Sequence, residues 1–243
     1  MALDLSRPVT DLSLSRPIHL AYLLAAVTDL AACERDTAGT ARINESHTID
    51  LARRLVALGA HIVFPSSNLV YDGSRPTPVA EDPVRPSTEY GRQKARVEAA
   101  LLALGSTAVL RLSKVVGPAT EPFASWVRKL RRGEAIEAFA DKVCAPVTLD
   151  DAVTLLVAIG RDRLEGLFQA SALRDLSYAE AAAILADQVG AGGRLVRVVS
   201  GRDRGVPDVF RPGHTTLDAS RLKMALNWSP PEPEKALCEG LGV

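Results

Sequence analysis

From residue 18 onward, short apolar runs alternate with longer amphipathic segments, and this alternation limits the possible folds more than any other feature of the sequence. Runs of strand length occupy 18–25, 61–66 and 107–113, and segments with apolar residues at helical spacing occupy 41–58 and 87–104. Repeated units of a buried strand followed by an amphipathic helix are typical of a parallel sheet that carries helices on its faces. We therefore predict an α/β fold built on such a sheet.

The pattern changes near 115–118, where the sequence reads VVGP. Shorter elements and more loops follow, and we expect helices at 122–131, 150–160 and 177–189, strands at 166–170 and 194–199, and two short helices near the C-terminus. This change indicates two parts, a sheet domain at 1–117 and a smaller lobe at 118–243. We expect the lobe to pack with the sheet domain as one unit and to form one wall of a cleft.

Charge and cysteine content narrow the functional classes. Lys plus Arg and Asp plus Glu both number 29, so no overall field favours nucleic acid or an anionic membrane as a partner. The three cysteines, Cys33, Cys144 and Cys238, are far apart and lack the spacing of metal ligands. Cysteines of this kind suit a reducing compartment, so we expect a cytoplasmic protein without a metal site.

The apolar stretch before Cys33 resembles a bacterial lipoprotein signal, because Arg16 precedes it and LAAC ends it. Asp29 interrupts the stretch, however, and Asp4 and Asp11 lie in a part that should be basic. The stretch is also too short to span a bilayer. We therefore interpret it as a strand buried on both faces.

A lysine interrupts the apolar side of the helix expected at 87–104. At helical spacing this side runs through Tyr90, Lys94, Val97 and Leu101, and residues four apart on a helix lie close together. An ammonium group about 4 Å from a phenol favours the phenolate by up to roughly 4 kcal/mol at an effective dielectric constant near 20, which is about 3 pKa units. We therefore expect Lys94 to lower the pKa of Tyr90 from about 10 toward about 7, where the phenol can exchange a proton with an alcohol or a carbonyl group.

Ordinary structural roles remain open for this pair and for the serines near it. A buried lysine can extend its charged end to the surface, and a tyrosine often packs in a core with its hydroxyl hydrogen-bonded. Ser66 and Ser67 stand at the end of the strand expected at 61–66, and ligands of parallel sheets bind at the carboxyl ends of strands. Serine in such a place is also a common turn residue.

Several motifs, taken in order, resemble one family. FPSSNLVYDG, EDPVRPSTEYGRQKARVE and AVLRLSKVVGP are similar to motifs of the extended short-chain dehydrogenase/reductases, and in particular of their dTDP-4-dehydrorhamnose reductase-like, sugar-nucleotide-binding branch. LLAAVTDLAACERD, INESHTIDLARRLVALGA, VCAPVTLDDAV and RPGHTTLDASRL also resemble segments of that branch, so that the resemblance extends from about Ala2 to Leu237. It implies a Rossmann-like sheet with a substrate lobe, NADP or NAD as cofactor, and a sugar nucleotide as the small-molecule substrate.

The resemblance also implies a role for each matching residue. Tyr90 is the general acid/base, Lys94 lowers its pKa and binds the nicotinamide ribose, and Ser67 holds the substrate oxygen. Asn44 supports Lys94 through the helix or a water molecule; as an alternative, it caps the N-terminus of a helix. The implied cofactor-binding positions are Ala25, Ala26, Lys94, Val115 and Gly117.

The family's first unit, a strand, a Gly-x-x-Gly-x-x-Gly turn and a helix, has no counterpart in the sequence. The glycine cluster GAGG at 190–193 follows a predicted helix and precedes a predicted strand, which is the reverse of the required order. The resemblance thus describes a truncated, incomplete Rossmann-like sheet that lacks roughly 50 residues, two strand–helix units. A start recorded too far downstream, a partner chain that supplies the missing part, or loss of the cofactor would each explain this. The strand at 18–25 would then be an open edge, which should recruit a partner chain, form a homo-oligomer or aggregate.

Two functional classes therefore remain open. One is an NAD(P)-dependent reductase or epimerase that acts on a carbonyl of a nucleotide-linked sugar, with Tyr90 as proton donor. The other is a non-catalytic regulatory or binding protein on the same scaffold. The basic run VRKLRR at 127–132 could contact a sugar-nucleotide diphosphate, but cations are common at helix C-termini, and we favour a solvated helix end.

Overall fold

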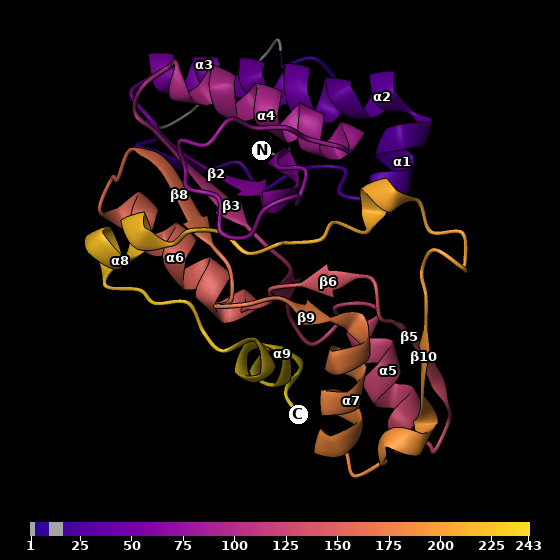
Figure 1. The fold of residues 1–243 in the computed structure, drawn as a ribbon. Helices are drawn as coiled ribbons and strands as arrows, with labels where there is room; N and C mark the ends of the chain where they lie inside the picture. Colours follow the sequence, from indigo (N-terminus) through magenta and orange to yellow (C-terminus); the bar gives the residue numbers. More distant parts are fainter. Residues whose placement is uncertain (1–2, 10–16) are drawn as a thin grey trace. The chain divides into compact units, whose positions relative to one another are not determined.

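The computed structural model describes residues 3–9 and 17–243, which form two compact units (Figure 1). Unit 1 contains the described residues up to Asp72 together with Pro83–Arg111 and Leu155–Phe168, and unit 2 contains Gly73–Asp82, Leu112–Thr154 and Gln169–Val243. The chain therefore passes from unit 1 to unit 2 after Arg111, whereas the sequence predicted a division at 117. Each unit also takes segments from the other side of that point.

Unit 1 is built on a four-stranded sheet in the order β1 (Leu20–Tyr22), β2 (His61–Ser67), β3 (Thr107–Leu112) and β8 (Gly166–Ala170), of which the last residues of β3 and β8 belong to unit 2. β1 and β2 are parallel, with Leu20 opposite His61 and Tyr22 opposite Val63. All of β3 and most of β2 is buried, as expected of central strands covered on both faces. The predicted α/β class is confirmed, and the strand expected at 18–25 is shorter than predicted.

Helices α3 (Thr48–Ala57) and α4 (Glu89–Leu102) pack against each other and against β2, and Figure 1 shows them together on one face of the strands. The helix predicted at 41–58 is a continuous helical segment that begins earlier, as α2 (Thr37–Ala41), and includes one π-helical turn, η1 (Arg42–His47), before α3. A further helix, α1 (Leu30–Arg35), was not predicted. The C-terminal part of α6 (Leu149–Arg161) approaches β1 at Gly160, where a Cβ would collide with the Tyr22 hydroxyl.

Within the described residues, unit 2 combines helices with three two-stranded sheets. β4 (Val115–Val116) and β7 (Val147–Thr148) are parallel, as are β5 (Ile136–Phe139) and β10 (Val196–Val199), whereas β6 (Val143–Cys144) and β9 (Leu176–Ser177) are antiparallel. The helices are α5 (Phe123–Arg131), α7 (Tyr178–Gln188), α8 (Ser220–Leu226) and α9 (Pro233–Leu241), with short 3-10 turns at Gly193–Leu195 and Asp208–Phe210. The longer predicted elements are confirmed. The two short helices predicted near the C-terminus are also present, as α8 and α9.

The core of unit 2 is organised by three aromatic rings. Phe123, Trp126 and Tyr178 have ring centroids 5.3 to 6.0 Å apart, in tilted and edge-to-face arrangements that favour aromatic contacts. α5 supplies two of these rings and α7 the third. The aromatic cluster therefore fixes the packing of α5 against α7.

The sequence stretch that resembled a lipoprotein signal leads into β1 and α1. Leu20–Tyr22 forms an edge strand of the described sheet, and Cys33 is a buried free cysteine in α1. Asp11 and Arg16 lie outside the described residues. None of the described helices combines the length and the apolar character needed to cross a membrane. A partner that covers the β1 edge remains a prediction.

Burial of His61 predicts that the stability of unit 1 is sensitive to acid. The side chain is fully buried at the start of β2, and neither ring nitrogen has a hydrogen-bond partner among the described residues. Burial, with help from the Arg163 charge, lowers the pKa of His61 below its usual 6.5. The folded state therefore takes up this proton less readily than the unfolded state, so the stabilising effect is complete above about pH 6.5 and is lost as pH falls from there through the lowered pKa.

We expect the free energy of unfolding to fall by up to about 1.4 kcal/mol per pH unit within that window because of this one group. A His61→Leu variant should lose that dependence and be at least as stable at neutral pH, since it removes two unpaired polar atoms. Denaturant titrations of both proteins between pH 7 and pH 5, read as a difference, measure the effect because the other histidines are common to both. Parallel pH curves would contradict the prediction.

Candidate active site

Helix α4 carries Tyr90 and Lys94 on its buried side. The helix begins after Thr88, whose hydroxyl accepts a hydrogen bond from the Gly91 amide at 3.1 Å, as an N-terminal cap does. Lys94 is only 5% exposed, and Val97 and Leu101, one and two turns on, are fully buried. Tyr90 is half-buried. The predicted position of Lys94 on the apolar side of the helix is therefore confirmed.

Gly91 lets the start of α4 lie close to the segment that follows β2. A Cβ at Gly91 would collide with the Leu69 carbonyl oxygen and stand 2.9 Å from its carbon. Leu69 belongs to the 3-10 turn η2 (Asn68–Val70), directly after Ser67. Any side chain at this position would therefore push the Tyr90 helix away from the end of β2.

The Lys94 ammonium group is directed toward the end of β2. Nζ donates a hydrogen bond to the Pro65 carbonyl at 2.9 Å and lies 4.2 Å from the centroid of the Phe64 ring and 5.7 Å from that of Tyr90. Burial lowers the pKa of Lys94 to about 8, although the nearby Glu98 acts in the opposite direction. The charge on this lysine is therefore easily lost in mildly alkaline solution.

The structure corrects the predicted pKa of Tyr90. Burial, with a smaller contribution from Cys33, raises the pKa of Tyr90 to about 12 instead of lowering it toward 7. The expected stabilisation by Lys94 rested on helical spacing, which places the two side chains near each other but says nothing about burial. The phenol is therefore neutral and carries its proton throughout the pH range in which proteins are stable. A neutral phenol is suited to donate a proton rather than to accept one.

Ser66 and Ser67 lie at the carboxyl end of β2, as predicted. The Ser67 hydroxyl accepts a hydrogen bond from the Leu69 amide at 3.2 Å and so caps η2, which is the turn role that the sequence left open. Its hydrogen atom is still available to a ligand oxygen. The Ser66 hydroxyl is buried without a partner among the described residues.

Asn44 joins the loop after β1 to helix α4. Its side chain accepts a hydrogen bond from the Val27 amide at 2.7 Å and donates to the Val27 carbonyl at 2.9 Å and to the Gln93 side chain at 2.7 Å. Asn44 lies inside the π-helical turn between α2 and α3, so its predicted alternative role as an N-terminal cap is wrong. Its contact with α4 is through Gln93, the neighbour of Lys94.

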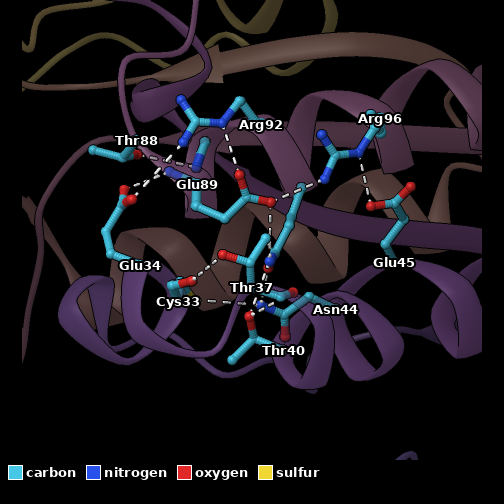
Figure 2. Close-up of polar contacts among 12 residues, drawn as sticks. Cys33, Glu34, Thr37, Thr40, Asn44, Glu45, Thr88, Glu89, Arg92 and Arg96 are labelled. Carbon is cyan, nitrogen blue, oxygen red and sulfur yellow. Dashed lines mark hydrogen bonds and ion pairs between the residues drawn. The ribbon is translucent and has the colours of Figure 1, made fainter.

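A polar network surrounds this contact and fixes the start of α4 (Figure 2). Gln93 donates to the Thr40 hydroxyl at 3.0 Å, and the Glu89 amide donates to Glu34 at 2.7 Å. Glu89 in turn accepts hydrogen bonds from Arg92 at 2.7 Å and Arg96 at 3.1 Å, and Arg96 also binds Glu45 at 2.7 Å. The network connects α1, α2 and η1 to α4, and sequence analysis did not identify Gln93 or Glu89 as part of the site.

The other predicted cofactor-binding residues fall in two places. Ala25 and Ala26 lie in unit 1, in the segment that follows the carboxyl end of β1, and Ala25 is exposed. Val115 and Gly117 lie in unit 2, where Val115 begins β4 and the Gly117 amide donates to the Thr120 hydroxyl at 2.8 Å. The role of all four residues in cofactor binding remains a prediction.

The basic run at 127–132 has the solvated character that we favoured. Arg128, Lys129 and Arg131 occupy the exposed last turn of α5, and Arg128 binds Glu121 at 2.8 Å. Arg132 binds Glu134 at 2.6 Å. Among the described residues, no group of three or more His, Cys, Asp or Glu side chains is arranged to hold a metal ion.

Comparison with known proteins gives consistent results. The family model described as the RmlD substrate binding domain matches residues 3–241. dTDP-4-dehydrorhamnose reductase of Sinorhizobium fredii is 26% identical over 215 residues, which cover 82% of this chain and 72% of the relative. Methionine adenosyltransferase 2 subunit beta of Bos taurus is 27% identical over 203 residues, 75% of this chain and 57% of the relative.

Solved structures show the same fold. dTDP-4-dehydrorhamnose reductase from Clostridium acetobutylicum has a TM-score of 0.81 at 21% identity and covers 92% of this chain and 80% of its own. The enzyme of that name from Bacillus anthracis, solved in complex with NADP, has a TM-score of 0.81 at 21% identity and covers 91% of this chain and 79% of its own.

Proposed function

Because the chain belongs to the RmlD substrate binding domain family, we propose that it reduces a carbonyl group of a nucleotide-linked sugar, with Tyr90 as the proton donor and NADPH or NADH as the source of hydride. The observation that carries this proposal is the neutral, half-buried Tyr90 one helical turn from the buried Lys94. The names of the relatives in Sinorhizobium fredii and Clostridium acetobutylicum support the choice of substrate class.

The described residues fit the nicotinamide end of such a cofactor. Lys94 uses one N–H on the Pro65 carbonyl and has others for a ribose hydroxyl, and Ala25 is an exposed residue beyond the carboxyl end of the neighbouring strand. No described glycine-rich segment stands between a strand and a helix in the order that binds a pyrophosphate, since the cluster at 190–193 follows α7 and precedes β10. Binding by this chain is therefore the first property to measure.

In the proposed reaction the protein's own residues hold the substrate and supply the proton. Ser67 holds the carbonyl oxygen of the sugar, and the Tyr90 phenol donates its proton to that oxygen as the carbonyl carbon is reduced. A nicotinamide cofactor, when bound, would supply the hydride. The Lys94 charge stabilises the phenolate that remains, and Asn44 and Gln93 hold the helix that carries both residues in place. The proton then returns to Tyr90 from solvent, which restores the starting state.

The proposal is tested with purified protein, dTDP-4-dehydrorhamnose and NADPH or NADH. We expect cofactor oxidation that depends on the keto sugar, and binding of at least one cofactor by calorimetry without it. The matching nucleotide sugar without a carbonyl at that position is the control and should give no oxidation. A well-folded chain that binds neither cofactor and oxidises neither would overturn the proposal.

That negative outcome would favour a non-catalytic binding or regulatory role. The specific observation in its favour is the 27% identity to a protein named as a subunit, methionine adenosyltransferase 2 subunit beta. In that case the polar network around α4 would stabilise the fold and would have no part in catalysis. The next experiment would then search for a partner protein whose activity changes when this chain is added.

The pH dependence of reduction should follow Lys94 and not Tyr90. The pKa of Lys94 is lowered to about 8 by burial, and that of Tyr90 is raised to about 12. We expect kcat/KM to fall by about tenfold per pH unit above about pH 8, as the ammonium loses its proton. A Lys94→Arg variant keeps its charge to much higher pH, so its profile should lose this fall even if its rate is lower. A wild-type profile that stays level through this region would contradict the assignment.

A further inference from the structure

Two lysines of unit 2, Lys114 and Lys142, lie near two aromatic rings that contact each other. Lys114 Nζ lies 5.8 Å from the centroid of the Phe123 ring, and Lys142 Nζ lies 4.9 Å from that of Tyr178. The two rings contact each other, with centroids 5.3 Å apart. Both lysines are half-buried. The aromatic core of unit 2 therefore holds two ammonium groups in one neighbourhood.

Within the part of the chain that the structure describes, neither lysine forms an ion pair. Lys114 donates a hydrogen bond to the Glu121 carbonyl at 3.3 Å, whereas the Glu121 carboxylate binds Arg128. Cys144 experiences the charges of both lysines and of one carboxylate, Asp175. Asp175 accepts hydrogen bonds from the amide and the hydroxyl of Thr215. The nearby acidic groups are thus engaged elsewhere, and the charges of both lysines are left uncompensated.

Several arginines of unit 2 show the opposite pattern. Arg128, Arg132, Arg174, Arg204 and Arg211 each have a carboxylate partner. Burial lowers the pKa of Lys114 and of Lys142, and the charge of Lys114 lowers that of Lys142 further. The second effect shows that the two ammonium groups act on each other. An anion bound by both would relieve the burial cost and the repulsion together.

We propose that Lys114 and Lys142 form a binding site for a phosphate-type anion with two negative charges, and that its physiological ligand is the diphosphate of the nucleotide-linked sugar. A lysine can bind phosphate as a point charge on a flexible stem. The choice of the sugar nucleotide as the carrier of the diphosphate rests on the proposed function. The site itself rests only on the geometry of the two lysines.

The test is calorimetry with pyrophosphate, dTDP and NADPH on the full chain. The variants are Lys114→Met and Lys142→Met, which keep the length and apolar contacts of the stems, and the matched control is Lys129→Met, an exposed lysine of α5. We expect each of the first two to weaken binding of pyrophosphate and dTDP by at least about tenfold, a typical loss for one charged hydrogen bond. The control should bind as the wild type does, and Lys142→Arg should retain most of the affinity.

A second readout separates anion binding from a change in folding. Because both pKa values are depressed, binding should be accompanied by proton uptake at alkaline pH, seen as a difference in heat between buffers of different ionisation enthalpy. Wild-type protein that does not bind pyrophosphate or dTDP, or variants that bind them unchanged, would overturn the site. Loss of NADPH binding with dTDP binding intact would overturn the assignment to the substrate.

These outcomes do not depend on turnover. An inactive chain that binds dTDP through the two lysines would refute the proposed reduction and leave the site standing. An active chain that binds dTDP equally well without either lysine would refute the anion site and leave the proposed reduction standing. Stronger binding of dTDP than of pyrophosphate identifies a nucleotide as the carrier, and equal binding argues for free diphosphate and against the sugar nucleotide.

Discussion

Tyr90→Phe should lower kcat/KM for carbonyl reduction by about 10²- to 10⁴-fold, the usual contribution of general acid catalysis. The substitution removes only the hydroxyl group. The phenylalanine ring can occupy the same half-buried place on α4, with the Lys94 ammonium at a similar distance from it. Because burial keeps the phenol neutral, the wild-type residue is a proton donor at every working pH, and the loss should be seen across the whole profile.

The measurement requires three readouts on one preparation: kcat/KM, the dissociation constant for NADPH, and the free energy of unfolding. We expect the first to change and the other two to stay close to their wild-type values. Tyr22→Phe is the matched control, since Tyr22 is another half-buried tyrosine of unit 1, on strand β1. It should reduce substrate at the parental rate. A Tyr90→Phe variant as active as this control would show that the proton comes from elsewhere.

The sequence predicted the position of Tyr90 and Lys94 well because local rules determine it. Thr88 caps the helix, and the apolar spacing through Val97 and Leu101 sets which side faces the sheet. The pKa of Tyr90 could not be predicted in the same way. Its direction depends on how deeply the phenol is buried in the folded chain, and Cys33, distant in the sequence, adds a smaller electrostatic effect in the same direction.

The hydrogen-bond partners of Asn44, Val27 and Gln93, were not predicted, for a related reason. A π-helical turn inserts a residue into the helical repeat, so spacing rules no longer tell which way a side chain within it points. The sequence also gives no indication that Gln93 is the partner of Asn44. A polar residue next to Lys94 would ordinarily be interpreted as exposed. Two-residue strands such as β4 and β6 are likewise too short to give an alternating pattern.

A buried ion pair behind the Tyr90 helix should have the largest effect on stability. Arg111 on β3 donates from Nε to both Glu98 carboxylate oxygens at 3.1 Å and from a terminal nitrogen to one of them at 2.6 Å. Both side chains are only 4% exposed, and the Tyr71 hydroxyl accepts a further hydrogen bond from Arg111 at 2.5 Å. The pair thus joins the strand to the helix that carries Lys94, one turn before Glu98.

Glu98→Leu should cost about 3–5 kcal/mol, because it leaves the Arg111 charge buried without its partner. The double variant Glu98→Leu with Arg111→Met should recover most of this loss, since an apolar pair of similar volume carries no desolvation cost. Both tryptophans, Trp126 and Trp228, lie in unit 2, so unfolding should be followed by circular dichroism and not by their fluorescence. A double variant no more stable than Glu98→Leu would mean that the site needs the charges themselves.

The double variant also separates stability from catalysis. Glu98 raises the pKa of Lys94 against the larger effect of burial, so without Glu98 that pKa should drop below about 8. The alkaline fall in kcat/KM should then begin at lower pH, even though the protein has regained its stability. An unchanged profile in a stable double variant would show that Lys94 does not set the alkaline limit. A shifted profile would show that Glu98 serves two purposes, holding α4 against β3 and keeping the lysine charged.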